Sequence, residues 1–68
     1  MGLTPEQRQE VEDYIRQLED TLYTLREWLK QAANTDKAGT KKDIDDHEKE
    51  LKANQDAIAE DDAEKAGS

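Results

Sequence analysis

Residue types that commonly build catalytic and metal sites are missing from this chain or nearly so. There is no cysteine and only one histidine, which excludes a disulfide, a thiolate metal site and a zinc site of several histidines. The only serine is Ser68, so no Ser/His/Asp or Cys/His set can be assembled. We therefore predict that the protein is not an enzyme and that it holds no cofactor and no metal ion.

Large apolar residues are also scarce, and they form no long run. Phenylalanine is absent, and no stretch approaches the ~20 apolar residues that span a bilayer. The N-terminus has no apolar signal region. A myristoylation motif requires Ser or Thr at the sixth residue, where Glu6 stands. We expect a cytoplasmic or otherwise intracellular protein that does not contact a membrane.

The charge balance is strongly acidic. Asp and Glu number 18 against 10 Lys and Arg, and the formal net charge is −8. This balance argues against direct binding to nucleic acid and is compatible with a basic protein partner. The 68 residues make at most one small domain, and chains of this size often need a partner because they bury a small share of their surface.

A heptad pattern dominates the first half of the chain. Apolar residues follow one another at alternating spacings of four and three, the repeat of a helix that packs along one seam. The residues at seam positions a and d are Val11, Ile15, Leu18, Leu22, Leu25, Leu29 and Ala32. Tyr14, Thr21 and Trp28 fall at position g and widen this stripe, whereas Tyr23 lies on the opposite side and is expected to be solvated.

The start of this helix is well marked. Thr4 is a good N-cap, Pro5 suits the first helical position, and Gln7 completes a capping box with Thr4. These signals predict a lead-in at residues 1–3 and a helix over about residues 5–33.

A turn and a second helix follow. Residues 34–39 have turn composition, and Asn34 is an acceptable left-handed residue after the first helix. Thr40 is the expected N-cap of a second helix over about residues 41–61. Residues 62–68 are expected to form a flexible acidic tail.

The second helix offers much less apolar surface than the first. Its large apolar residues are spaced seven apart: Ile44, Leu51 and Ile58. The alternating seam positions hold His47 and Asn54, or Glu48 and Gln55 if the seam tilts the other way. A buried Asn54 would set the register of the helices, and the alternative places it at the edge of the seam.

Two patterns resemble metal sites. His47 stands four residues after Asp43 and three before Glu50, a spacing that needs further ligands from elsewhere to hold a metal ion. The start of an EF-hand loop is suggested by residues 43–46, but Glu48 occupies the position of the required glycine. We interpret both as parts of a solvated helix.

Two segments resemble a spectrin-like repeat. They are residues 25–29 (Leu-Arg-Glu-Trp-Leu) and residues 43–51 (Asp-Ile-Asp-Asp-His-Glu-Lys-Glu-Leu). The resemblance covers about residues 11–60. It implies a helical scaffold whose third helix comes from elsewhere, with Trp28 in the core.

The predicted fold is all-α: a two-helix antiparallel hairpin, coiled-coil-like, that associates into a helical bundle. The second helix cannot cover the whole stripe of the first, so a second copy or a helix of another protein is expected to meet it. Tyr14 and Trp28 are predicted as interface anchors, with internal packing as the alternative. The full predicted interface is Val11, Tyr14, Ile15, Leu18, Leu22, Leu25, Trp28, Leu29, Ile44, Leu51 and Ile58.

The predicted function is therefore protein–protein interaction. One alternative is an acidic mimic of nucleic acid that inhibits a basic DNA- or RNA-binding protein. Another is a designed or excised helical scaffold, with which the terminal Gly67 and Ser68 are consistent.

Overall fold

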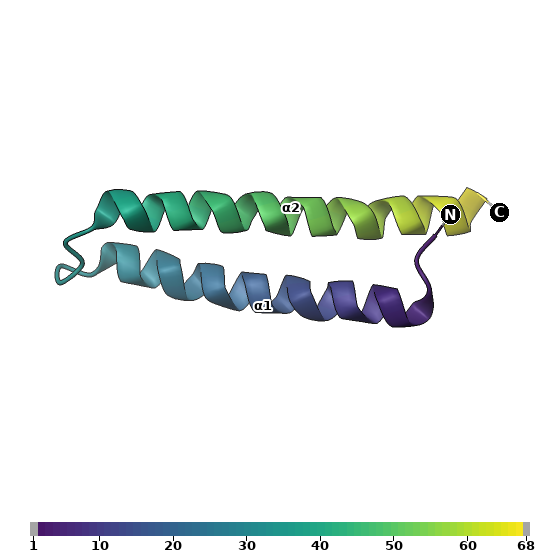
Figure 1. The fold of residues 1–68 in the computed structure, drawn as a ribbon, viewed down its shortest axis with the longest axis horizontal. Helices are drawn as coiled ribbons and strands as arrows, with labels where there is room; N and C mark the ends of the chain where they lie inside the picture. Colours follow the sequence, from purple (N-terminus) through teal and green to yellow (C-terminus); the bar gives the residue numbers. More distant parts are fainter. Residues whose placement is uncertain (1, 68) are drawn as a thin grey trace.

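The computed structural model describes residues 2–67 and shows two helices packed side by side. Helix α1 spans Pro5–Lys30 and helix α2 spans Lys37–Gly67, and they run antiparallel (Figure 1). The Cα atoms fill an elongated volume of 52 × 16 × 13 Å. The predicted all-α antiparallel hairpin is confirmed. No helix among the described residues is long and apolar enough to cross a membrane.

The start of α1 follows the predicted capping box. The Thr4 hydroxyl accepts from the Gln7 N–H, and the Gln7 side chain accepts from the Thr4 N–H, each at 3.1 Å. Pro5 occupies the first turn, where its missing N–H costs no hydrogen bond. Local sequence signals are sufficient to place this end of the helix.

The end of α1 comes earlier than predicted. The helix stops at Lys30 rather than near residue 33, and Gln31 is extended. The Lys37 ammonium donates to the carbonyls of Leu29 (2.6 Å) and Gln31 (3.2 Å), which satisfies groups that the helix end leaves open. Asn34 is an acceptable residue for a left-handed conformation, but it does not adopt one, since no described non-glycine residue has a positive φ.

Asn34 instead acts through its side chain. It is buried, and its amide nitrogen donates to the Trp28 carbonyl (3.3 Å) and to the Thr40 hydroxyl (3.1 Å). Its carbonyl oxygen accepts from the Asp36 N–H. One side chain therefore joins the end of α1 to the beginning of α2.

The predicted N-cap of α2 is wrong by one turn. The helix begins at Lys37, and Thr40 lies buried within its first turn. Asp36 provides the cap, because its carboxylate accepts from the Gly39 N–H at 3.0 Å. A Cβ atom on Gly39 would clash with this carboxylate, so glycine suits the position. The connection therefore covers residues 31–36 rather than 34–39.

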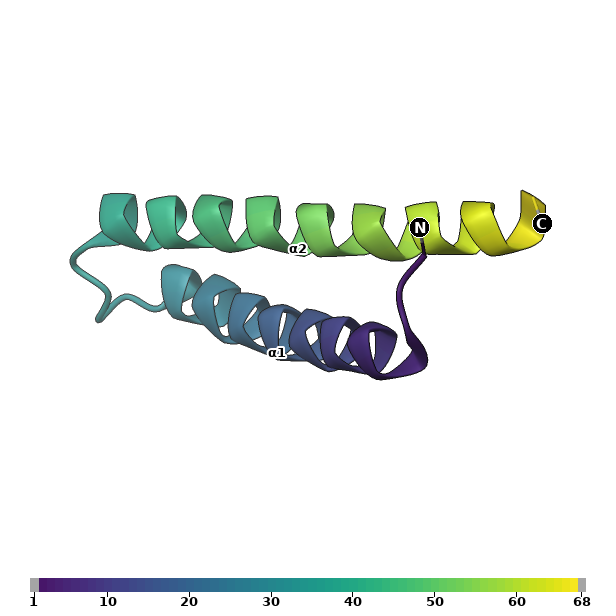
Figure 2. The same cartoon turned by 45° about the vertical axis from the view of Figure 1, so that its right-hand side comes forward.

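The predicted flexible tail is also corrected. Helix α2 continues through Gly67 instead of ending near residue 61, and Ser68, like Met1, lies outside the described residues. Asp61 and Lys65 form an i,i+4 ion pair at 2.8 Å in this last stretch. The segment at residues 2–4 crosses from the start of α1 to the side of α2 (Figures 1 and 2), and it contacts α2 there.

The apolar core is small and lies in the middle of the hairpin. Only Leu18 (4% exposed) and Leu22 (1% exposed) are buried hydrophobic residues among those described. On α2, burial recurs at spacings of four and three, as in α1. The buried or half-buried residues in this row are Thr40, Ile44, His47, Leu51, Asn54, Ile58 and Asp61.

Candidate interaction surface

The residues predicted as an interface fall into three groups. Leu18 and Leu22 are enclosed within the hairpin itself. Tyr14 and Trp28 are exposed, at 40% and 45%. The remaining members are half-buried: Val11, Ile15, Leu25, Leu29, Ile44, Leu51 and Ile58. The surface open to a partner is therefore the two edges of the seam rather than its centre.

The second helix faces the seam with alternating apolar and polar residues. The polar row has a spacing of seven and consists of Thr40, His47, Asn54 and Asp61. Of the two predicted alternatives, the seam thus contains His47 and Asn54, because Glu48 and Gln55 are exposed.

Three of these polar side chains bond to the carbonyl four residues earlier in the chain. The Thr40 hydroxyl donates to the Asp36 carbonyl (2.9 Å), and the Asn54 amide donates to the Glu50 carbonyl (2.8 Å). The Nδ1 atom of His47 lies 2.6 Å from the Asp43 carbonyl, which can only accept, so Nδ1 carries the proton. Asn54 is half-buried and bonds within α2, so its hydrogen bond sets no register between the helices.

The metal-like spacings of the sequence do not converge. Among residues 2–67 no group of three or more His, Asp or Glu side chains could hold a metal ion. The ring of His47 bonds to backbone, and Asp43 and Glu50 flank it on the same helix. The Glu50 carboxylate accepts a hydrogen bond from the Tyr14 hydroxyl.

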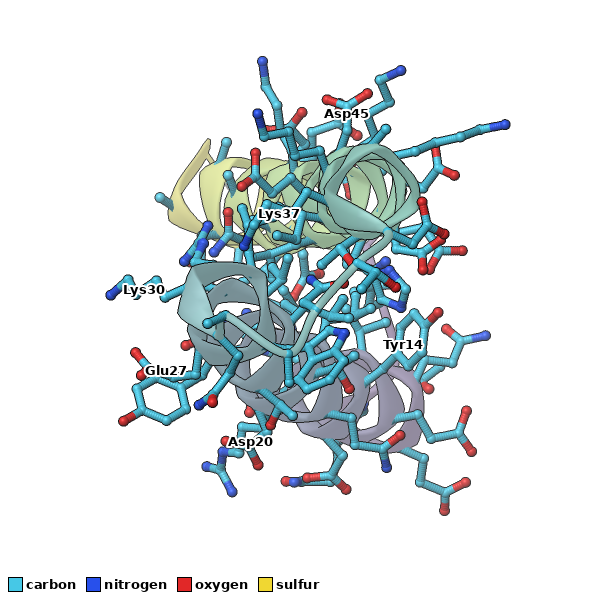
Figure 3. The ribbon with its side chains drawn as sticks, turned by 90° about the vertical axis from the view of Figure 1, so that its left-hand side faces the viewer. Tyr14, Asp20, Glu27, Lys30, Lys37 and Asp45 are labelled. Carbon is cyan, nitrogen blue, oxygen red and sulfur yellow. The ribbon has the colours of Figure 1, made fainter. Side chains whose placement is uncertain are left out.

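Tyr14 and Glu50 define one flank of the hairpin. The Tyr14 hydroxyl donates to the Glu50 carboxylate at 2.8 Å, a bond that raises the pKa of this phenol above its ordinary value. Viewed along the hairpin, Tyr14 and Lys30 lie on opposite sides (Figure 3). Trp28 occupies the same heptad position as Tyr14, two repeats further on. We call this side, with Tyr14, Trp28, Asp43 and Glu50, the aromatic flank.

The opposite flank carries an apolar groove. Ile15 and Ile58 lie in a groove of about 420 Å³ between the helices. The other lining residues are Glu12, Arg16, Glu19, Gln55, Ala59 and Asp62. Arg26 and Glu48 pair at 2.8 Å across the helices. We call this side the groove flank; it presents charges of both signs.

An ion cluster around the buried Asp61 joins the two helices at the open end of the hairpin. Asp61 is 2% exposed, and its carboxylate accepts from Arg8 (2.8 Å), from Lys65 (2.8 Å) and from the Leu3 N–H (2.7 Å). The bond from Lys65, helped by those from Leu3 and Arg8, holds the pKa of Asp61 below its ordinary value despite burial. Asp62 also accepts from Arg8, at 2.6 Å.

This cluster is not among the sequence predictions, although the heptad repeat contains its signal. Arg8 stands seven residues before Ile15, and Asp61 stands seven after Asn54. Extending both rows by one repeat places opposite charges at facing seam positions. The pair is therefore visible once polar residues are accepted at seam positions.

Comparison with models of known protein families, with curated proteins and with solved structures finds no match for this chain. In this hairpin Trp28 is 45% exposed, whereas the spectrin-like resemblance implies a place in a core. A tryptophan in that position would need a third helix to cover it.

Proposed function

We propose that this protein is a non-enzymatic interaction module that docks a helix against the exposed edge of α1. The helix comes from a second copy or from another protein. The observation that carries the proposal is the exposure of Tyr14 and Trp28 beside a seam that α2 covers only in part. Tyrosine and tryptophan are frequent anchors of interfaces.

The energetic argument rests on surface that the hairpin leaves in water. Completing the burial of one large apolar side chain is worth up to ~1.5–3 kcal/mol. Val11 and Leu25 occupy seam position d, next to the g position of the two aromatics, and both remain half-buried. A docked helix would cover this edge as a third member of the bundle, as the spectrin-like resemblance also suggests.

The seam centre is unsuitable for testing this proposal. A charge at Leu22 would disrupt the hairpin, since Leu22 is its most buried side chain. Trp28→Ala is the better probe because the residue is partly exposed. Tyr23→Ala is the matched control, since Tyr23 is 69% exposed on the outer face of α1.

The test is sedimentation equilibrium over a concentration series, with both variants. A dimer or tetramer that Trp28→Ala weakens and Tyr23→Ala does not would support self-assembly. A monomer at every concentration would reject self-assembly and leave docking of another protein's helix. Association that is insensitive to Trp28→Ala would contradict the proposed surface.

Salt separates this proposal from mimicry of nucleic acid. A mimic binds through its carboxylates alone, so its affinity falls steeply with ionic strength and does not depend on Trp28. An interface that buries aromatic rings keeps part of its affinity in high salt, and Trp28→Ala lowers that affinity.

A further inference from the structure

We propose that the aromatic flank binds a basic amphipathic helix of another protein, rather than a second copy of this chain. The inference rests on the proposed function and names the partner's chemistry. Its evidence is the unequal distribution of charge between the two flanks of the hairpin.

The aromatic flank has no basic residue. Its positions follow from the heptad rows that contain Tyr14 and Glu50 and from the next row outward on each helix. On α1 these are Gln7, Glu10, Tyr14, Gln17, Thr21, Thr24 and Trp28. On α2 they are Asp43, Asp46, Glu50, Ala53, Ala57, Glu60 and Glu64. The flank therefore has carboxylates on six positions and neither Lys, Arg nor His on any.

The corresponding rows on the groove flank contain equal numbers of acidic and basic residues. The rows that contain Glu12 and Glu48, with the next row outward, include five acids and five bases. The acids are Glu12, Glu19, Asp45, Glu48 and Asp62, and the bases are Arg16, Arg26, Lys30, Lys41 and Lys52. The excess negative charge that faces a partner is thus concentrated beside the exposed aromatics.

Carboxylates and aromatic rings together select a cationic partner. The faces of Trp and Tyr rings attract Lys and Arg side chains, and carboxylates form charge-assisted hydrogen bonds with them. In the antiparallel register set by Tyr14 and Glu50, Asp43 falls level with the stretch between Tyr14 and Trp28. Acids and rings therefore line the same segment.

The spacing of the aromatics suits a helix. Tyr14 and Trp28 are 14 residues apart on α1, which is about 21 Å at the rise of an α-helix. A partner helix of about four turns spans both rings. Its apolar stripe would lie on Tyr14, Trp28 and the half-buried Val11 and Leu25, and its Lys or Arg residues would face the carboxylates of α2.

A second copy does not fit this flank. A two-fold interface places the same patch on both sides, so carboxylates would face carboxylates, and each copy already has a net charge of −8. Like charges brought together in an interface oppose association. The same repulsion excludes nucleic acid as the occupant.

The experiment titrates the full chain with two synthetic amphipathic helices of about 18 residues. One has leucine on its apolar face and lysine elsewhere, and the other has glutamate in place of lysine. The readout is calorimetry at about 0.15 M salt, where distant charges are screened, together with fluorescence of Trp28, the only tryptophan. We expect the lysine peptide to bind and to shift Trp28 emission to shorter wavelength, and the glutamate peptide not to bind.

Two matched double variants separate the aromatic flank from net charge. Asp43→Asn with Glu50→Gln removes two charges from the aromatic flank, and Asp45→Asn with Glu48→Gln removes two from the groove flank. We expect the first pair to weaken binding about tenfold and the second less than about twofold. Trp28→Ala should also weaken binding about tenfold, against no change for Tyr23→Ala. Circular dichroism checks that every variant remains helical.

The outcomes are distinct. Equal weakening by both double variants, or binding that leaves Trp28 emission unchanged, would overturn the assignment to the aromatic flank. Failure of the lysine peptide to bind would overturn the inference. If sedimentation then shows a dimer sensitive to Trp28→Ala, the proposed function stands without the inference; if the chain is a monomer, the proposed function is reduced to docking of a helix that is not basic.

Discussion

The two helices share one seam but contribute to it differently. Helix α1 supplies an apolar residue at every seam position from Val11 to Leu29, whereas α2 alternates apolar residues with the polar row that includes His47 and Asn54. Three of the four members of that row bond to the carbonyl four residues earlier in the chain, so their polarity is satisfied without help from α1. A helix held beside its partner by a short connection can pack with few apolar contacts, because the connection keeps the two helices close.

The comparison also explains where the hairpin is open. Because α2 covers the centre of the α1 stripe and no more, Leu18 and Leu22 are buried and Tyr14 and Trp28 are not. The less apolar helix therefore determines which parts of the more apolar one face solvent. Four changes test this division between the helices.

The largest effect is expected at the centre of the α1 stripe. Leu22→Ala removes the most buried side chain and should lower the free energy of unfolding by ~2–5 kcal/mol, as large-to-small core substitutions do. Urea denaturation followed by circular dichroism measures it. Tyr23→Ala is the control, with an expected change below ~0.5 kcal/mol because that side chain lies on the surface. Similar losses in the two variants would contradict the assigned core.

The next substitution is expected to raise the free energy of unfolding, because it makes the seam face of α2 more apolar, like that of α1. Asn54→Leu gives up a hydrogen bond within α2 and places an apolar side chain in the seam, so we expect a gain of ~1–2 kcal/mol in the free energy of unfolding. The urea midpoint reports the gain. Ala63→Leu, on the exposed outer face of α2, should leave it nearly unchanged. A destabilised Asn54→Leu would mean that the polar row is required for packing.

A smaller loss is expected at the beginning of α2. Asp36→Ala removes the carboxylate that caps the Gly39 N–H, and loss of a cap costs ~0.5–2 kcal/mol. Asp36→Asn should retain most of the stability, since its amide oxygen can accept the same bond. The melting temperature of the three proteins gives the ranking. No loss in Asp36→Ala would indicate that Thr40 caps the helix, as the sequence suggested.

The mildest effect concerns the ion cluster that joins the helices at the open end. The pKa of Asp61 is lowered in the folded protein, so its contribution is present above the ordinary carboxyl pKa of 3.8 and is lost as the pH falls through the lower folded value. Asp61→Asn removes this titration, and its amide oxygen can still accept from Leu3. We therefore expect the melting temperature of the variant to change less between pH 5 and pH 2, roughly the range over which paired carboxylates titrate. Parallel pH profiles for the two proteins would contradict the role of Asp61.

Much of the fold could be predicted because its signals are local. The heptad spacing of α1 requires a helix, and the Thr4–Gln7 box places its start without reference to anything distant. The small number of apolar residues in α2 predicted that part of the α1 stripe would stay uncovered in an isolated hairpin, and Tyr14 and Trp28 are exposed in the structure. These features depend on periodicity and capping, which neighbouring residues determine.

Other features depended on the tertiary structure. Asp36 and Thr40 are both good caps, and local propensity does not choose between them. In the structure Asp36 caps α2, and the Thr40 hydroxyl accepts from the Asn34 side chain. The composition of the last turns of α2 predicts a flexible polar tail. In the structure Asp61 bonds to Arg8 and Leu3, more than 50 residues away, and these bonds hold the last turns against the start of the chain.

The sequence alone thus determined the helical period, the antiparallel hairpin and the surplus of apolar surface on α1. The structure was needed to place the end of α1, both ends of α2 and the pairing of heptad rows into two flanks of different charge. Periodicity is repeated many times along the chain, so no single contact can override it. A helix end depends on one or two hydrogen bonds, and some of these, such as the bonds of Asp61 to Arg8 and Leu3, form only after the helices have packed.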